Sequence, residues 1–100
     1  MGHRLAPRAE ADLEELAFYV FVETGNLEIA NRLVDSITER FALLGTHPNA
    51  GRRRDDLRPG IRSFPVGSYV VLYRIEGDDV LVQRVVRGSR DLEALFREQG

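Results

Sequence analysis

The spacing of the apolar residues changes from helical to strand-like near residue 50, and this change constrains the fold more than any other feature. Before residue 50 the apolar residues recur every three or four positions, as on one face of an α-helix. After it, β-branched and aromatic residues gather in short runs separated by glycine and acidic turn residues, which indicates strands. Helices followed by a series of strands predict an α+β fold.

Two amphipathic helices are predicted in the first half. Pro7 suits the first turn of a helix, where its missing N–H costs nothing, and residues 24–26 end that helix. Asn26 is a candidate N-cap for the second helix, which Gly45 and Pro48 are expected to end. The connection is so short that the helices should form an antiparallel hairpin. The apolar stripes are Ala9, Leu13, Leu16, Ala17, Val20 and Phe21 in the first helix and Ala30, Leu33, Val34, Ile37, Phe41 and Leu44 in the second, and the second stripe is expected to pack on the sheet.

Four strands and a short final helix complete the prediction. The strands are residues 3–5, 61–66, 69–75 and 80–87, with a hairpin turn over 76–79. Pro65 indicates an edge position for its strand, because proline cannot donate to a sheet. Residues 49–60 are interpreted as a charged loop, and residues 91–99 as a short helix. The order β-α-α-β-β-β predicts one domain over residues 1–100, with the helical hairpin packed on a mostly antiparallel, twisted sheet.

Length and composition exclude several classes of protein. One hundred residues suffice for one compact domain and are too few for two. The chain has no cysteine, so disulfides and thiolate metal sites are excluded, which suits a reducing cytoplasm. No apolar run approaches the roughly 20 residues of a membrane span, and the N-terminus does not resemble a signal peptide. We therefore expect a cytoplasmic protein that needs no cofactor.

The two halves of the chain differ in charge. Residues 1–50 contain four arginines against eight acids, whereas residues 51–100 contain ten arginines against eight acids. Every basic residue is arginine, which makes planar, bidentate contacts with carboxylates and phosphates. The absence of lysine also leaves no amine to act as a general base. The second half is therefore the half expected to meet an acidic partner.

Several short motifs stand in a characteristic order and spacing. They are residues 9–13 (AEADL), His47-Pro48 with Gly51, residues 58–62 (RPGIR), Tyr69 with Tyr73-Arg74, and Arg84-Val85 with Gly88 and Arg90-Asp91. Together they make the chain resemble the RelE/ParE superfamily of bacterial toxins. The resemblance covers nearly the whole chain. It implies the toxin of a type II toxin–antitoxin pair, neutralised by a partner antitoxin. ParE-type members poison DNA gyrase, whereas RelE-type members cleave messenger RNA on the ribosome.

The residues that the resemblance would assign to RNA cleavage are incomplete here. The superfamily's nucleases use lysines before the central strands, an arginine after the strand tyrosine, a late arginine, and a C-terminal tyrosine or histidine. In this chain Val70 follows Tyr69, and Phe96 occupies the terminal position, where it cannot exchange a proton. Arg90 matches the late arginine. We therefore assign no catalytic residue and favour the ParE-like branch, with the ribonuclease and a degenerate, non-toxic binding module as alternatives.

Arginines in the second half are the candidates for binding the target. The residues assigned to this role are Arg52, Arg53, Arg54, Arg87 and Arg90. The alternative for the run at 52–54 is a solvated loop that Asp55 and Asp56 partly neutralise. Arg84 is instead expected to pair with Asp91, with Glu93 or with an acid of the helical hairpin, and Arg90-Asp91 fits a structural ion pair as well as a site.

The first helix carries more apolar residues than one stripe requires. Phe18, Tyr19 and Val22 widen its apolar face. Either the sheet covers them, or they form an exposed groove for an amphipathic antitoxin helix, and the resemblance favours the groove. Tyr69 and Tyr73 share one strand face and are expected in the core with tethered hydroxyls. His47 is the only histidine outside the N-terminus, so no metal site is predicted.

Overall fold

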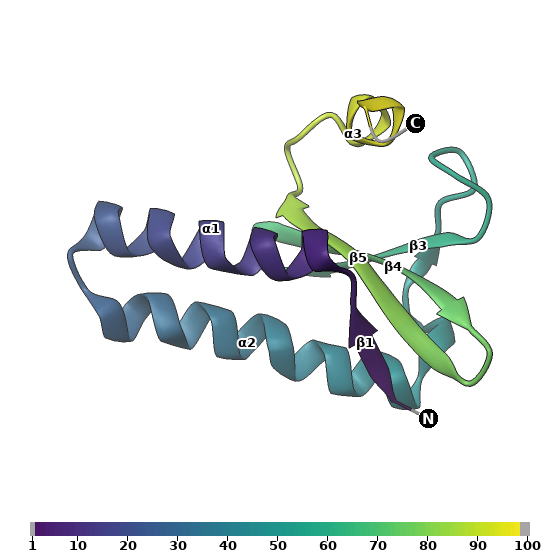
Figure 1. The fold of residues 1–100 in the computed structure, drawn as a ribbon, viewed down its shortest axis with the longest axis horizontal. Coiled ribbons are helices and arrows are strands. Elements are labelled where there is room, and N and C mark those ends of the chain that lie inside the picture. The colour runs from purple at the N-terminus through teal and green to yellow at the C-terminus, as the bar shows by residue number, and fades with distance from the viewer. Residues whose placement is uncertain (1, 99–100) are drawn as a thin grey trace.

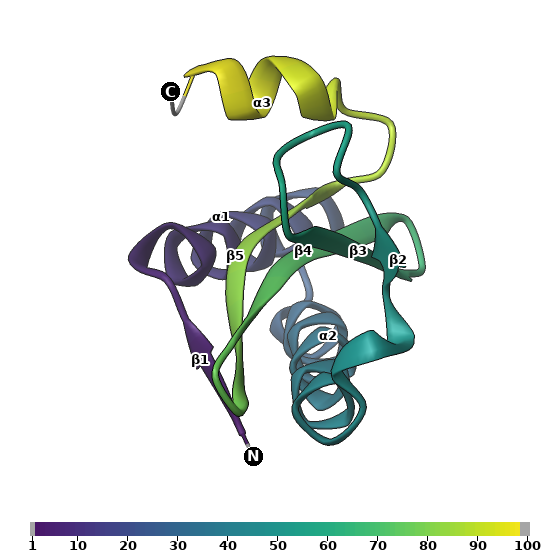
Figure 2. The ribbon, with the colours of Figure 1, turned by 90° about the vertical axis from the view of Figure 1, so that its right-hand side faces the viewer.

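The computed structural model describes residues 2–98 as a five-stranded sheet with helices on both faces. The long helices α1 and α2 form an antiparallel pair on one face, and the short helix α3 lies over the other (Figures 1 and 2). The elements are β1 (His3–Leu5), α1 (Pro7–Thr24), α2 (Leu27–Thr46), the 3-10 turn η1 (Pro48–Ala50), β2 (Arg52–Arg53), β3 (Ile61–Val66), β4 (Tyr69–Glu76), β5 (Asp79–Arg87) and α3 (Leu92–Glu98). The predicted α+β architecture is confirmed.

The sheet has the strand order β1-β5-β4-β3-β2. Only β1 runs parallel to its neighbour, β5, and all other pairs are antiparallel, as predicted. The strand β2 was not predicted: Arg52 and Arg53 pair with Ser63 and Arg62 of β3, inside the segment interpreted as a loop. Two consecutive arginines carry no strand propensity, so this pairing depends on contacts elsewhere in the chain.

Most of the predicted helix ends are confirmed. Gly25 ends α1 in the left-handed conformation, with φ of 65°. The Asn26 side chain accepts hydrogen bonds from the N–H groups of Glu28 and Ile29, at 2.9 and 3.2 Å, and caps α2. Helix α2 ends at Thr46, between Gly45 and Pro48, the two residues expected to end it. Gly45 also allows close packing, since a Cβ there would lie 3.1 Å from the Gly2 backbone.

A bulge in β5 decides which residues face the helical hairpin. Leu72 of β4 pairs with Arg84 and Tyr73 pairs with Val82, so Gln83 has no partner opposite it. Strict alternation would place Val82 and Val85 on opposite faces. Because of the extra residue, both pack in the core under the helical hairpin.

Two apolar cores lie on opposite faces of the sheet. The larger lies under α1 and α2, where Ala30, Ile37 and Phe41 are buried as predicted, with Leu33 and Val34 partly buried beside them. It also takes up Tyr69, Val71 and Tyr73, so the two tyrosines share a face as predicted. The smaller core consists of Ile61, Leu72, Val86, Leu95 and Phe96, with Leu57, Val70 and Leu92 packed against it.

The short helix α3 closes the smaller core. The Asp91 carboxylate accepts from the Ala94 N–H at 3.1 Å, so Asp91 caps this helix. The proposed ion pair between Arg90 and Asp91 is absent from the described part of the chain, and this reading was wrong. The predicted final residue of the helix, Gln99, lies outside the described residues.

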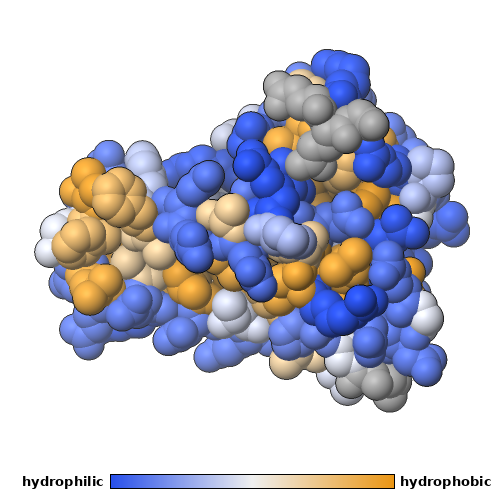
Figure 3. Space-filling model, in the orientation of Figure 1, coloured by the Kyte–Doolittle hydropathy of each residue, from blue (hydrophilic) through white to orange (hydrophobic). Residues whose placement is uncertain are grey.

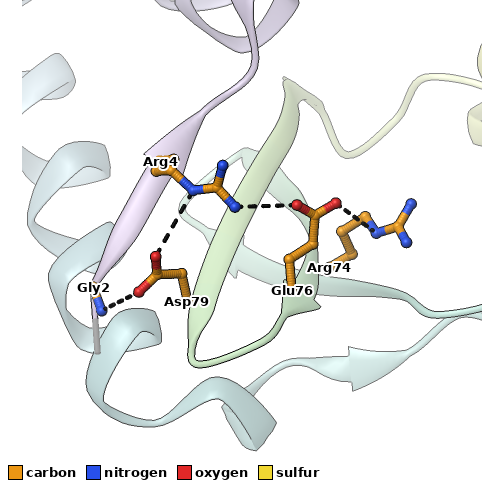
Figure 4. Close-up of polar contacts among 5 residues, drawn as sticks. All are labelled: Gly2, Arg4, Arg74, Glu76 and Asp79. Carbon is orange, nitrogen blue, oxygen red and sulfur yellow. Dashed lines mark hydrogen bonds and ion pairs between the residues drawn. The ribbon is translucent and has the colours of Figure 1, made fainter.

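Ion pairs attach the N-terminal strand to the hairpin between β4 and β5 (Figure 4). Arg4 lies 3.1 Å from Glu76 and 3.8 Å from Asp79, and Arg74 contacts the other oxygen of Glu76 at 3.4 Å. The Gly2 N–H donates to Asp79 at 3.1 Å. The charged groups are partly exposed, so each pair stabilises the fold by about 1 kcal/mol at most. None of the helices within residues 2–98 is long and apolar enough to cross a membrane.

Candidate functional site

A buried ion pair joins the motif at the start of α1 to the motif at the end of β5. Arg84 Nε donates to Asp12 Oδ2 at 2.8 Å, and Arg84 Nη2 donates to Asp12 Oδ1 at 3.1 Å. Their side chains are only 2% and 5% exposed. Asp12 also accepts a hydrogen bond from the Val85 N–H at 2.9 Å. Strand β1 pairs with β5 only as far as Val82, so Val85 lies beyond that pairing. The predicted pairing of Arg84 with the helical hairpin is confirmed, and the pair acts as a structural clamp.

Asp12 is the residue whose role the sequence reasoning missed. An acid in the first turns of a helix is already explained by the positive end of the helix dipole, so its type alone does not single it out. Its position offered a better signal, because it lies three residues after Ala9 and four before Leu16, on the buried stripe of α1. A carboxylate at such a position needs a buried partner. Arg84 is that partner.

A second clamp joins η1 to the middle of the sheet. The Tyr73 hydroxyl donates to the Pro48 carbonyl at 2.7 Å and accepts from the Gly51 N–H at 2.8 Å. Arg62 donates to the Gly51 carbonyl at 2.8 Å. A Cβ on Gly51 would overlap the Tyr73 ring and hydroxyl, which explains the glycine. Burial raises the pKa of the Tyr73 hydroxyl above its usual value. The predicted tethered hydroxyl is confirmed for this tyrosine.

The residues that replace the nuclease groups belong to the smaller core. Phe96 is only 3% exposed, and its ring lies 5.3 Å from the Arg58 guanidinium carbon. Arg58 also donates to the Phe96 carbonyl at 3.3 Å. Val70 packs against the same core. The side chains at these two positions therefore hold α3 on the sheet and offer no group for proton transfer.

The arginine run at 52–54 is largely neutralised by its neighbours. Arg53 lies 2.9 Å from Asp55, and Arg54 lies 3.0 Å from Asp56. A hydrogen bond from the Gly60 N–H lowers the pKa of Asp55, and a hydrogen bond from Arg54 lowers the pKa of Asp56. Arg52 forms no ion pair or side-chain hydrogen bond among residues 2–97, although its charge also acts on Asp56. The alternative interpretation, in which Asp55 and Asp56 partly neutralise this run, therefore holds for Arg53 and Arg54.

A small pocket lies between α1 and the end of β5, and we call it the arginine pocket. It measures about 180 Å³ and is lined by Asp12, Glu15, Leu16, Tyr19, Tyr69, Val85, Val86, Arg87 and Arg90. The Arg87 guanidinium carbon lies 5.4 Å from the centroid of the Tyr19 ring and 5.6 Å from that of Tyr69. Both distances are within cation–π range. The pocket therefore brings together Arg87 and Arg90, two of the five arginines predicted to bind the target.

The other three arginines lie elsewhere. Arg52 and Arg54 line a separate pocket of about 440 Å³ beside Gly88 and Leu92. Arg53 lines a third, with Asp55 and Arg62. The five predicted residues therefore form several basic surfaces rather than one site.

An apolar patch covers the end of the helical hairpin (Figure 3). Phe18, Tyr19 and Val22 are 68%, 49% and 61% exposed, so the sheet does not cover them. The other large exposed apolar residues at this end are Phe21, Leu27 and Ile29. We call these six residues the apolar patch. Tyr19 belongs to both the patch and the arginine pocket, so the two surfaces are continuous.

Metal binding finds no support in the described residues. Within residues 2–98 no group of three histidine, aspartate or glutamate residues could hold an ion. His47 ends α2, and its N–H donates to the Leu43 carbonyl at 2.8 Å. His47 therefore has a structural role at the end of this helix.

Comparisons with known proteins give a consistent result. A family model described as "ParE toxin of type II toxin-antitoxin system, parDE" matches residues 4–92. The chain is 34% identical over 94 residues to Toxin ParE3 of Caulobacter vibrioides, covering 94% of each sequence. It is 33% identical over 82 residues to Toxin RelE3 of the same organism, covering 81% of this chain and 87% of that protein. A chain of the structure titled "Chromosomal ParDE TA system from P. aeruginosa" has a TM-score of 0.76 and 26% identity, covering 87% of this chain and 95% of that chain.

Proposed function

The chain belongs to the family of ParE toxins of type II toxin–antitoxin systems, and we propose that it inhibits DNA gyrase by binding and is neutralised by a cognate antitoxin. The two parts of this proposal concern adjoining surfaces, because the antitoxin would cover the apolar patch and the target would bind the arginines, with Tyr19 common to both. Both partners would meet the chain in the cytoplasm, which a protein without cysteine suits.

The apolar patch supports an antitoxin partner. Phe18 and Val22 expose most of their side chains to water, and contiguous apolar surface of this kind marks a binding site. An amphipathic helix laid along α1 would bury it. The similar P. aeruginosa chain belongs to a structure titled as a ParDE toxin–antitoxin system. A neighbouring gene for a small, acidic, partly disordered protein with a DNA-binding N-terminus would be the expected antitoxin.

The burial of Phe96 is the observation that carries the choice of gyrase over messenger RNA. RNA cleavage needs an acid for the leaving oxygen, and a phenylalanine that is 3% exposed supplies none. The similarity to Toxin RelE3 keeps the ribosome-dependent ribonuclease as the second candidate. Arg90 would serve either activity, so it does not separate them.

The target would bind through the unneutralised arginines. Arg52, Arg87 and Arg90 form no ion pair with any residue in the described range. Arg53 and Arg54 would contribute less, because each already pairs with an aspartate. A surface of this kind binds by charge complementarity, so its affinity should fall as salt rises.

Expression of the chain without an antitoxin tests the proposal. Pulse labelling after induction should show early loss of DNA synthesis with protein synthesis initially intact. Purified chain should inhibit supercoiling by purified gyrase. Early loss of protein synthesis, with discrete codon-positioned cuts by primer extension and normal supercoiling, would establish the ribonuclease instead. No effect on growth or on either assay would indicate a binding module without toxicity.

A further inference from the structure

We propose that the arginine pocket, which lies directly beside the apolar patch, binds one acidic side chain of the antitoxin. This inference rests on the proposed function, because it names the contact that fixes the antitoxin on α1. Neutralisation would then work by direct occlusion, since the acidic side chain would occupy the two arginines, Arg87 and Arg90, that the target is proposed to use.

Arg87 is held in place without being neutralised. Its guanidinium carbon lies 5.4 and 5.6 Å from the ring centroids of Tyr19 and Tyr69. These rings restrict the side chain, yet in the described chain none of its five N–H donors meets a carboxylate. Arg84, three residues earlier, has the opposite environment, with a bidentate partner in Asp12. A restricted guanidinium with free donors loses little side-chain entropy when a carboxylate arrives.

The charge of the pocket favours one carboxylate. Asp12 is neutralised by Arg84, which leaves Arg87 and Arg90 against the carboxylate of Glu15. Two positive charges against one negative charge give a pocket charge of +1. Glu15 forms no ion pair with either arginine in the part of the chain that the structure describes. A single incoming carboxylate would balance the pocket.

The size and surroundings of the pocket exclude larger or more highly charged ligands. About 180 Å³ is below the roughly 300–1,000 Å³ of sites for small molecules, so one side chain fits better than a substrate. A nucleic-acid backbone would bring several phosphates against α1, which also exposes Glu10, Glu14, Glu15 and Glu23. Their repulsion favours a protein segment that delivers one acidic group.

The shared residue Tyr19 sets the geometry of that segment. The pocket lies at Glu15, Leu16 and Tyr19 of α1, and Val22 lies about one helical turn further along the helix. An antitoxin helix that covers Phe18 and Val22 should therefore carry an aspartate or glutamate about one turn from its apolar anchors. The expected chemistry is an apolar stripe with an acid beside one end.

Titration with propionate tests the pocket without any antitoxin. Propionate mimics the glutamate side chain, and propionamide is its neutral counterpart of similar shape. In NMR spectra of the full chain, propionate should shift the Nε–H signals of Arg87 and Arg90, whereas propionamide should not. Arg87→Gln should abolish the shift at Arg90. Equal shifts at Arg40, an exposed arginine without an ion pair in the described chain, would indicate unspecific binding and overturn the assignment.

Binding of the protein encoded beside this chain tests the role of the pocket. Arg87→Gln should weaken that complex about tenfold and reduce its dependence on salt, since a paired charge at an interface is lost. Arg40→Gln is the matched control and should change affinity less than twofold. Unchanged affinity in both Arg87→Gln and Arg90→Gln would overturn this inference and leave the proposed function standing. Failure of the unmodified chain to bind would overturn both.

Discussion

Arg84 and Arg87 lie three residues apart on one strand and have opposite environments. Arg84 is 2% exposed and forms a bidentate pair with Asp12. Arg87 is exposed, and its guanidinium lies against the rings of Tyr19 and Tyr69, without an ion pair among the described residues. The first arginine stabilises the fold, whereas the second is available to a partner. An arginine motif therefore does not indicate a site until the position of each guanidinium is known.

The same contrast extends to the other motifs that carry the family resemblance. Tyr73 and Gly51 form the clamp on η1, and Arg58 contacts Phe96 of α3. The surfaces proposed for partners instead use side chains that contribute little to packing, such as Phe18 and Arg52. The motif residues and the residues proposed to bind partners are thus largely different sets, although Arg90 belongs to both.

Asp12→Ala should cause one of the two largest losses of stability. It leaves Arg84 buried without a partner, which costs about 3–5 kcal/mol of unfolding free energy. Glu14→Ala, an exposed acid on the same helix, should change it by less than about 0.5 kcal/mol. Urea denaturation of both variants measures the difference. Equal midpoints for the two variants would mean that the clamp does not stabilise the fold.

Two phenylalanines extend this comparison to apolar residues. Phe41 is 1% exposed, so Phe41→Ala should cost about 3–5 kcal/mol through lost packing and the cavity it leaves. Phe18 is 68% exposed, and Phe18→Ala should cost less than about 0.5 kcal/mol while weakening antitoxin binding. Denaturation midpoints and a binding titration separate the two effects. A large loss of stability in Phe18→Ala would show that the patch belongs to the core.

Much of the fold could be predicted because the spacing of apolar residues along the sequence indicates which face of a helix or strand is buried. The helical stripes, the cap at Asn26 and the turn at Gly25 were all readable from the sequence. The strand β2 was not, because Arg52 and Arg53 pair through backbone groups whose positions depend on distant residues. The bulge at Gln83 could not be predicted either, because it also depends on tertiary contacts. It nevertheless places Val85 on the face of the sheet that α1 and α2 cover.

The candidate site was less predictable than the fold. Sequence reasoning could place Arg87 and Arg90 near each other, because only three positions separate them. It could not show that Tyr19, 68 positions before Arg87, lies against that arginine. Nor could it show that Asp55 and Asp56 neutralise two of the arginines while leaving Arg52 free within the described chain. Such facts depend on tertiary contacts that leave no local pattern.

Tyr73→Phe should have an intermediate effect. It removes the hydroxyl that joins the Gly51 N–H to the Pro48 carbonyl, and unsatisfied buried groups cost about 1–3 kcal/mol.

The Tyr73 hydroxyl should also make the free energy of unfolding depend on pH in the alkaline range. Because burial raises the pKa of Tyr73, the unfolded chain loses this proton first, near its ordinary pKa of about 10. Stability should therefore be retained below that pH and fall as the pH rises through the folded pKa. Denaturation in urea between pH 8 and 11, by circular dichroism, should show a smaller decrease for Tyr73→Phe than for the unmodified chain.

Charge reversal at Arg90 should have the smallest effect on stability and a large effect on toxicity. Arg90 is exposed and without an ion pair among the described residues, so Arg90→Glu should change the unfolding free energy by less than about 0.5 kcal/mol. It would nevertheless reverse one charge of the arginine pocket, which both proposed partners need. Arg32→Glu is the control, because Arg32 is also exposed but lies on α2, 3.7 Å from Glu28 in a weak surface pair. Growth after induction should recover in Arg90→Glu and not in Arg32→Glu, and gyrase supercoiling should follow the same order. Equal toxicity of the two variants, at equal stability, would show that the exposed arginines of β5 and its following turn are no more functional than those of the helical hairpin.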